Sequence, residues 1–419
     1  MKRVGEPVRQ TNKQLMEDIK KANLPMATKQ SNIDFSNTEI AFAHKSDKEL
    51  KQTAWLFRMM NKSWLVNIGS KLGVTAVKWQ LPFAKSMVEA TIFQQFCGGT
   101  TLLRSKETIS QLYDYNVLSV LDYGAEAKDT EEDFNVIMNE IIRGLEFAAN
   151  NESVPVVVCK LSGMARNELL EKVSSGATLT AAEEKEFRNV RKRVESICHV
   201  AQRDDTALFF DAEESWIQEA IDMLVQEMME RYNKKKVYIY GTYQMYLTNS
   251  FPKLQRDHER AMEKGYMIGA KLVRGAYMNK ERERAAEMGY PSPVQPNKAA
   301  TDQDFNDAVR YCVDRYQILA SCNASHNQDS CKLQADLIVQ SNLPKDHPHL
   351  NFCQLLGMSD HLTFNLGKAG FNVAKYLVYG PVEEVLPYLV RRAEENSSVT
   401  GDMSRELALI ETELDRRGI

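Results

Sequence analysis

A regular alternation of short apolar runs and longer charged segments constrains the fold of this chain from residue 116 onward. Each run is rich in β-branched or aromatic residues, and the segment that follows it has helical periodicity. Strict alternation predicts parallel strands covered by helices, and eight units fit a distorted (β/α)8 TIM-type barrel better than an open doubly wound sheet. The expected strands are residues 116–124, 154–163, 206–214, 235–244, 267–277, 318–326, 349–357 and 374–382.

The rest of the chain divides around this barrel. The chain begins with a polar, weakly periodic stretch that is typical of a flexible lead-in or a loosely packed helix. A capping box, Ser46 to Glu49, then precedes apolar residues at helical spacing, whose apolar face fits packing on the barrel better than membrane binding. The expected divisions are the lead-in over 1–35, a helical arm over 36–115, the barrel over 116–400 with an extra helix at 181–202, and a C-terminal helix over 401–419.

Composition favours a small-molecule partner. The chain has 53 basic and 57 acidic residues, a net charge of -4, so no overall positive field attracts nucleic acid. Its seven cysteines are scattered without a CxxC pair, which predicts buried thiols in a reduced protein. No apolar run approaches the roughly 20 residues that cross a bilayer, so we expect any membrane contact to be peripheral.

Two common kinds of site lack support in the sequence. Neither GxGxxG nor GxxxxGK[ST] occurs, which argues against a Rossmann domain or a P-loop. His347 and His349 precede a strand, in a loop expected at the amino-terminal face of the barrel, and we expect no metal site there.

Polar residues end almost every expected strand. In a (β/α)8 barrel the carboxyl ends of the strands converge on one cavity, so polar groups at those ends indicate a site. Lys160 and Asp211 end neighbouring strands, which fits an ion pair, although a buried lysine is also suited to form a Schiff base. The residues at these ends are Asp122 with Glu126, Lys160, Asp211 with Glu213, Gln244, Lys271 to Tyr277, Ser325 to Asn327, Gln354 to Met358, and Tyr379.

Two adjacent arginines, Arg391 and Arg392, follow the last expected strand. Adjacent side chains lie about 100° apart around a helix. One interpretation is a solvated helix, on which Arg391 pairs with Glu395 four residues on. The other is that both guanidinium groups bind one carboxylate from a helix over the barrel mouth. The residues alone leave both interpretations open.

Several segments, in the same order, resemble the proline dehydrogenase family, including the corresponding domain of the bifunctional proline utilisation A proteins. The helical segment with NTEIAFAHKSDKEL resembles the monofunctional, eukaryote-like branch of the family. The barrel segments that carry the resemblance are FFDAEES (209–215), YGTYQMYL (240–247), KLVRGAYMNKERERAAEMGYPSP (271–293), ASHNQ (324–328), CQLLGMSD (353–360) and YGPVEEVLPYLVRRAEENSSV (379–399).

The resemblance implies a flavoenzyme of proline catabolism. Its members oxidise L-proline to Δ1-pyrroline-5-carboxylate by hydride transfer from the proline C5 to FAD N5, and pass the electrons to a membrane quinone. The last helix then lies over the barrel mouth. A bacterial protein would bind the cytoplasmic face of the membrane peripherally, and a eukaryotic one the matrix side of the mitochondrial inner membrane.

The resemblance also implies roles for individual residues. Lys160 pairs with Asp211 in the site, and Lys271 supplies a cation near flavin N5, where many bacterial relatives have arginine. The residues implied at the substrate are Arg391 and Arg392 on the carboxylate, Tyr379, Leu355 and Tyr277 on the ring, and Glu395 and Glu126 beside the arginines. Those implied at FAD are Gln244, Lys271, Arg274, Gly275, Ala276, Tyr277, Lys298, Thr301, Ser325 and His326.

Three other functions fit parts of the pattern. A lysine Schiff-base lyase on the same barrel would use Lys160 or Lys271, and borohydride would trap its substrate. Methylenetetrahydrofolate reductase, another flavin barrel, would oxidise NAD(P)H. A non-enzymatic helical scaffold would bind no chromophore and leaves the polar strand ends without a purpose.

Overall fold

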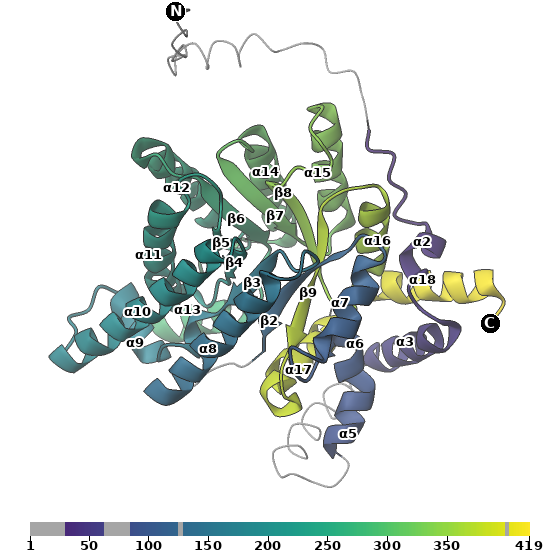
Figure 1. Ribbon diagram of the computed structural model, residues 1–419, viewed down its shortest axis with the longest axis horizontal. Coiled ribbons are helices and arrows are strands. Elements are labelled where there is room, and N and C mark those ends of the chain that lie inside the picture. Colours follow the sequence, from purple (N-terminus) through teal and green to yellow (C-terminus); the bar gives the residue numbers. More distant parts are fainter. Residues whose placement is uncertain (1–29, 63–83, 125–128, 399–401) are drawn as a thin grey trace, which may run out of the picture.

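Eight parallel strands close into a barrel because β9 pairs with both β8 and β2 (Figure 1). The computed structural model describes residues 30–62, 84–124, 129–398 and 402–419. Each strand overlaps one of the eight expected runs, so the predicted (β/α)8 barrel is confirmed. The strands are β2 (Leu118–Tyr123), β3 (Val156–Cys159), β4 (Ala207–Phe210), β5 (Ile239–Gln244), β6 (Ile268–Val273), β7 (Leu319–Ala324), β8 (Leu350–Leu355) and β9 (Val373–Tyr379).

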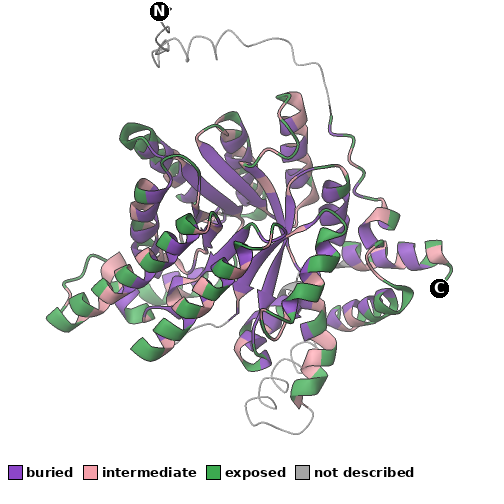
Figure 2. Ribbon diagram, in the orientation of Figure 1, coloured by how far each residue is buried: buried purple, intermediate pink, exposed green. Residues whose placement is uncertain are grey.

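Helices surround the barrel, with their buried faces toward the strands and their exposed faces outward (Figure 2). The buried faces contribute apolar side chains to the core. The extra helix expected at 181–202 is α10, whose start is fixed by a capping box between Thr180 and Glu183. The helices are α8 (Glu131–Ala148), α9 (Asn167–Ser174), α10 (Ala181–Arg203), α11 (Ser215–Tyr232), α12 (Ser250–Lys264), α13 (Met278–Met288), α14 (Lys298–Asp314), α15 (Gln328–Gln340), α16 (Asp360–Lys368) and α17 (Val382–Ser398).

Alternate residues of each strand face the inside of the barrel and the helices outside. In β9, Tyr376 and Val378 belong to the inner apolar cluster, whereas Leu377 and Tyr379 belong to the outer cluster beneath the helices. The seven cysteines are all buried and free, as expected for core thiols. This two-residue period decides which polar side chains reach the cavity at the carboxyl ends of the strands.

The amino-terminal segment differs from the expected arm in two places. It contains α2 (Thr38–Phe42), α3 (Asp47–Met60), α5 (Ala84–Val88), η1 (Glu89–Phe93), α6 (Gln94–Phe96) and α7 (Ser105–Tyr113), but also a strand, β1 (Cys97–Gly99), which pairs with β9. Three residues are too few to show strand periodicity in the sequence. The lead-in is also ordered at its end, because Ser31 donates to Asp336 of α15 and Phe35 is buried in the core.

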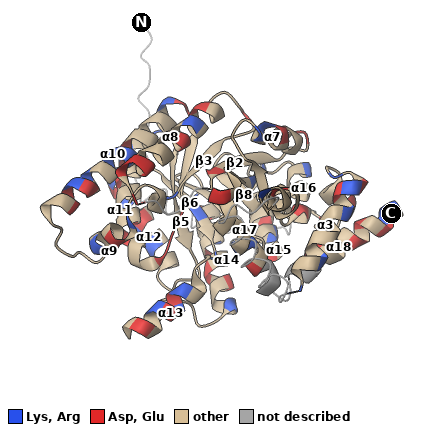
Figure 3. Ribbon diagram, turned by 90° about the horizontal axis from the view of Figure 1, so that it is seen from below, with Lys and Arg blue, Asp and Glu red and all other residues tan. Residues whose placement is uncertain are grey.

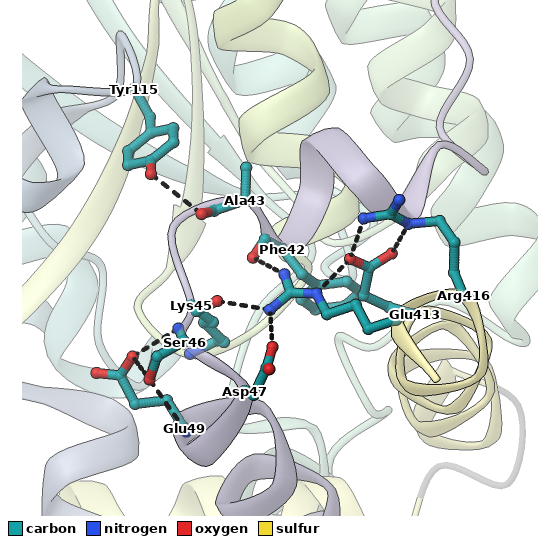
Figure 4. A network of polar contacts seen from close by, with 10 residues as sticks. Phe42, Ala43, Lys45, Ser46, Asp47, Glu49, Tyr115, Glu413 and Arg416 are labelled. Atoms are coloured by element: carbon teal, nitrogen blue, oxygen red, sulfur yellow. Dashed lines mark hydrogen bonds and ion pairs between the residues drawn. The ribbon is translucent and has the colours of Figure 1, made fainter. Parts of the chain in front are cut away.

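The C-terminal helix α18 (Asp402–Arg417) packs beside α2 and α3 through Phe42, Phe57 and Ile410. Polar contacts reinforce this packing. The buried Glu413 carboxylate accepts from Arg416 at 2.8 Å and from Arg417 at 2.7 Å. Arg417 also donates to the main-chain oxygens of Phe42 and Lys45 in the α2–α3 turn. Figure 4 shows these contacts, together with the predicted capping box between Ser46 and Glu49 that starts α3.

Charged side chains of both signs are interspersed along the outer helices, for example α8 and α10 (Figure 3). This mixture agrees with the net charge of -4. Within the residues that the structure describes, no helix is both long and apolar enough to cross a bilayer.

Replacing Glu413 with Gln should destabilise the chain, because the charged acceptor for two arginines is lost. Charge-assisted hydrogen bonds contribute roughly 2 kcal/mol each to the free energy of unfolding, and we expect a loss of about that size. Denaturant unfolding measures it. The control is Glu411→Gln, also on α18, which removes an exposed pair with Arg58 of α3 and should cost no more than about 0.5 kcal/mol. Equal effects of the two substitutions would contradict the prediction.

Candidate active site

A cavity of about 440 Å³ opens at the carboxyl ends of the strands, beneath α17 and the start of α18. Most of the residues expected at the site reach it. Those that line it are Lys160, Asp211, Gln244, Lys271, Arg274, Gly275, Ala276, Tyr277, Lys298, Ser325, His326, Leu355, Arg391 and Arg392.

Two aspartates and two lysines form a connected network on the floor of the cavity. Lys160 Nζ lies 2.5 Å from Asp122 Oδ2 and 3.9 Å from Asp211 Oδ2. Lys271 Nζ donates to Asp211 Oδ1 at 2.6 Å. Lys160 therefore lies closer to Asp122 than to Asp211, the partner that we expected from the sequence.

The network keeps opposite charges together in a dry environment. Burial alone would raise the pKa of Asp211, but Lys271 and Lys160 lower it below its ordinary value. Burial raises the pKa of Asp122, and Lys160 only partly opposes this effect. Asp211 is therefore the carboxylate of the network that stays ionised most readily, with a lysine on either side.

The tyrosine in the cavity is Tyr376, and the expectation for Tyr379 was wrong. Tyr376 Oη donates to Asp211 Oδ2 at 2.7 Å, and its ring lies 4.7 Å from Lys271 Nζ. Tyr379 faces outward, with its ring near Tyr123 and its hydroxyl near α8. The two residues are three positions apart, and an odd spacing along a strand places side chains on opposite faces.

The turn after β6 brings backbone and cations to the cavity wall. Gly275 has φ +127°, and a Cβ there would lie 1.7 Å from the Tyr246 ring, so glycine is required. Arg274 is held by Asp302 at 2.7 Å and by Ser325 Oγ at 2.6 Å. Its guanidinium is therefore oriented by fixed partners at the cavity wall.

Gln244 is also held in one orientation at the cavity wall. Its amide donates to the main-chain oxygen of Glu213 at 2.7 Å. The Glu213 side chain, in turn, accepts from the main-chain nitrogen of Ser162 at 2.9 Å.

Besides Tyr379, one described site residue, Thr301, does not line the cavity, and the side chains of two others are not described. Thr301 is nearly buried and its hydroxyl faces the main-chain oxygen of Asn297 at 3.4 Å, so it turns away from the cavity within its own helix. Lys298, one turn earlier, lines the cavity and pairs with Asp302 at 2.6 Å. Glu126 and the side chain of Glu395 lie outside the described residues.

The two arginines of α17 both line the cavity, which argues against the interpretation of a solvated helix. Arg392 is only 7% exposed, and its guanidinium lies 5.1 Å from the centre of the Tyr388 ring. Arg391 lines the same wall. A solvated helix face would expose at least one of them fully.

Tyr376, Ser359 and Glu406 also line the cavity but were not among the expected site residues. The inward phase of β9 could have identified Tyr376. No sequence signal identifies Glu406, because it reaches the cavity from the separate helix α18.

The lining suits a cofactor with phosphate groups and a substrate with a carboxylate group. Among the described residues, six basic and three acidic side chains line the cavity. Backbone at Gly275, the Gln244 amide and the Ser325 hydroxyl add hydrogen-bonding groups, which is the kind of donor set that FAD requires. Within the described ranges, no group of three or more His, Cys, Asp or Glu residues is placed to hold a metal ion.

The fold and this cavity define the class: a (β/α)8 barrel with a cationic binding site at the carboxyl ends of its strands. The family model for proline dehydrogenase matches residues 105–405. The chain is similar to proline dehydrogenase 1, mitochondrial, from Dictyostelium discoideum, at 30% identity over 434 residues, covering 91% of this chain and 74% of the relative. The chain belongs to the proline dehydrogenase family.

Other relatives are matched over part of their length. Proline dehydrogenase 1, mitochondrial, from Drosophila melanogaster is 40% identical over 245 residues, which are 56% of this chain and 36% of the relative. The proline utilization A structure from Bdellovibrio bacteriovorus matches with a TM-score of 0.69 at 18% identity, over 94% of this chain and 41% of that one, and shows the same fold.

Glu213 should make stability depend on pH. Burial raises the pKa of its carboxyl from 4.5 to about 7. Between these values the unfolded chain loses the proton while the folded chain keeps it, so the free energy of unfolding falls as pH rises from about 4.5 through 7. Glu213→Gln should flatten this part of the profile, as measured by denaturant unfolding at several pH values. Parallel profiles for the variant and the wild type would contradict this assignment.

Proposed function

We propose that this chain is an FAD-dependent dehydrogenase that oxidises L-proline to Δ1-pyrroline-5-carboxylate. The observation that carries the proposal is the shared cavity, in which two arginines from α17 face the network of Asp211, Lys160 and Lys271. Membership of the proline dehydrogenase family supports the same substrate.

In this proposal, the arginines bind and orient the substrate. Arg391 and Arg392 hold the proline carboxylate, and the buried position of Arg392 makes its contact strong because water competes little. Leu355, Tyr277 and Tyr376 surround the pyrrolidine ring, and Tyr376 takes the position first assigned to Tyr379. The family resemblance also assigns Glu395 and Glu126 to the arginines. Positioning is then the main contribution of these side chains.

The proposed cofactor site uses Gln244, the Arg274 to Tyr277 turn, Ser325 with His326, and Lys298. Bound FAD supplies the hydride acceptor for this chemistry. Lys271 provides a fixed positive charge beside it, because Asp211 pairs with its ammonium group. Thr301 lies in the same helix as Lys298 but contributes no cavity-lining atom, so we assign it no direct contact.

The proposed electron acceptor is a membrane quinone, reached through peripheral contact with the membrane. The names of the Dictyostelium and Drosophila relatives include the word mitochondrial. On that basis we propose the matrix side of the mitochondrial inner membrane as the location for a eukaryotic source, and the cytoplasmic face for a bacterial one.

The cavity geometry disfavours a Schiff-base lyase. Such an enzyme needs a neutral lysine amine, which burial produces when no carboxylate is close. Here Lys160 and Lys271 each lie within 2.6 Å of an aspartate oxygen. Each amine is therefore held in an ion pair with a carboxylate, which does not leave it available to attack a carbonyl group.

The direct test is to add L-proline anaerobically to the purified chain loaded with FAD. We expect the visible flavin absorbance to bleach and an artificial quinone to restore it. Bleaching by NAD(P)H but not by proline would instead indicate methylenetetrahydrofolate reductase chemistry. Trapping of a carbonyl substrate by borohydride would indicate the lyase.

Replacing Arg392 with Met should raise the proline KM sharply while leaving FAD bound. Removing one partner of a buried charge-assisted contact costs about 2–5 kcal/mol, so KM should rise by roughly 30-fold or more. Steady-state kinetics measure it. Arg143→Met, which changes an exposed arginine on α8, is the matched control and should leave KM unchanged. An unaltered KM in Arg392→Met would exclude the proposed clamp.

The paired substitutions Tyr376→Phe and Tyr379→Phe test the corrected assignment. Tyr376→Phe removes the hydroxyl that donates to Asp211, so kcat/KM for proline should fall roughly five- to tenfold. Tyr379→Phe changes a ring beneath the helices and should stay within about twofold. Kinetics that show the larger loss for Tyr379→Phe would reverse the assignment.

A further inference from the structure

The loop between β8 and α16, residues 356–359, separates two cavities. Leu355, which ends β8, and Met358 line the candidate active site. Leu356 and Gly357 line a second cavity of about 480 Å³, which lies between the amino-terminal arm and the barrel. Because the lining of a cavity lacks contacts on one side, the loop receives less support from packing than a core segment does. Its position therefore depends on polar contacts.

Lys375 holds both ends of the loop. This fully buried residue lies on β9 beside Tyr376, with its side chain on the opposite face of the strand. Its Nζ donates to the main-chain oxygen of Met358 at 2.5 Å and lies 3.5 Å from that of Leu355. The same ammonium group pairs with Asp360 Oδ1, at the start of α16, at 2.8 Å. One buried cation thus ties the loop to the neighbouring strand.

The pair between Lys375 and Asp360 is stabilised by its surroundings. Burial alone would raise the pKa of Asp360, but Lys375 and His44 of the α2–α3 turn lower it well below its ordinary value. His44 Nε2 lies 3.5 Å from Asp360 Oδ2. Asp360 therefore stays ionised, and little water reaches these groups to compete for their hydrogen bonds.

The arm holds the middle of the loop through Gln95 of α6. Gln95 Nε2 donates to the main-chain oxygen of Gly357 at 2.8 Å, and its Oε1 accepts from Thr53 of α3 at 3.3 Å. The two segments approach closely, since a Cβ on Gly357, whose φ is +78°, would lie 2.1 Å from the main-chain oxygen of Gln95. The loop is therefore fitted to the arm as well as to β9.

The backbone of Ser359 shows that the loop is held in a strained shape. Its φ of 52° and ψ of 42° lie in the left-handed region, which is unfavourable for a residue other than glycine and persists only where the surroundings hold it. In this conformation Ser359 Oγ lies 2.8 Å from Nδ1 of His326, which also lines the active site. A change in the loop would therefore reach the cavity directly.

We propose that Lys375 and Gln95 are positioning residues of the active site: they hold the β8–α16 loop so that Leu355 and Met358 form the wall on which the proline ring packs. This inference rests on the proposed oxidation of proline. It also gives the arm a role in substrate binding, because Gln95 contacts the loop from the side opposite to the active site.

The first test is the double variant Lys375→Met with Asp360→Asn, which removes both charges and so leaves neither buried and unpaired. The proline KM should rise roughly five- to tenfold, as expected for the loss of the hydrogen bonds to the loop, and kcat should fall less, because ring packing contributes before and during the reaction. The matched control is Lys345→Met, an exposed lysine that donates to the main-chain oxygen of Ala369, and it should keep the wild-type KM. A wild-type KM in the double variant would overturn the proposal.

A second comparison decides the matter even where the double variant fails to fold. Gln95→Ala changes a half-buried residue and should raise the proline KM roughly two- to fivefold, with an unfolding midpoint close to that of the wild type. Gln94→Ala, which changes its exposed neighbour on the same helix, is the control and should leave KM unaltered. Equal KM values for Gln95→Ala and Gln94→Ala would refute the role of the arm.

A third measurement needs no cofactor and separates this inference from the proposed function. The methyl resonance of Met358, assigned with Met358→Leu, reports the position of the loop in the full-length chain before FAD is added. It should shift in Gln95→Ala and in the double variant, but not in Gln94→Ala or Lys345→Met. An unshifted resonance in Gln95→Ala would contradict the inference. Failure of the wild type to oxidise proline would instead refute the proposed function, whatever the resonance shows.

Discussion

The ion pair between Asp211 and Lys271 is the contact on which the rest of the cavity depends. Lys271 projects into a barrel interior that is otherwise lined by groups such as Val120, Phe209 and Tyr376. An unpaired ammonium group there would lose its proton or destabilise the fold, because desolvation of a single charge is expensive. Burial opposes ionisation, but Lys271 and Lys160 lower the pKa of Asp211, so the aspartate stays ionised beside the lysines. The floor of the cavity is therefore a set of paired opposite charges.

The network is placed at the ends of the strands: Asp122 and Lys271 lie within β2 and β6, and Lys160 and Asp211 directly follow β3 and β4. Val120 and Asp122 share one face of β2, and on the next two strands the inward Val158 and Phe209 each precede an ionisable residue by two positions. The apolar layer therefore lies directly beneath the charged one. The parallel register also sets the position of each layer along the barrel axis, since Val158 of β3 is paired with Phe209 of β4. Side chains on paired strands are more rigidly held than side chains on loops, which suits a site that works by positioning.

The sequence predicted the barrel well because the alternation of strand and helix repeats eight times. A misplaced boundary in one run does not alter the number of strand–helix units. The sequence predicted the arginine pair and most of the lining because these residues sit at or next to the ends of elements. The prediction for Tyr379 was wrong. The end of the strand was located correctly, but the face of the strand that points into the barrel was not identified. The sequence also missed Glu406, which lines the cavity from α18, a helix outside the repeating units of the barrel. Thr301 was also predicted wrongly, because its hydroxyl donates to the main-chain oxygen of Asn297 in the preceding turn and does not reach the cavity. Sequence alone does not show which of these partners a threonine takes.

The surroundings of Asp211 suit a lysine at position 271, where many bacterial relatives in the family have arginine. Asp211 offers two oxygens, and they are already divided: Oδ1 accepts from Lys271 and Oδ2 from Tyr376. An ammonium group needs only one of them, and its compact charge also lies over the Tyr376 ring at 4.7 Å. A guanidinium that bound both oxygens would displace the tyrosine hydroxyl. Lys271 and Tyr376 therefore form a matched pair around one carboxylate, and a change at either position alters what the other can bind.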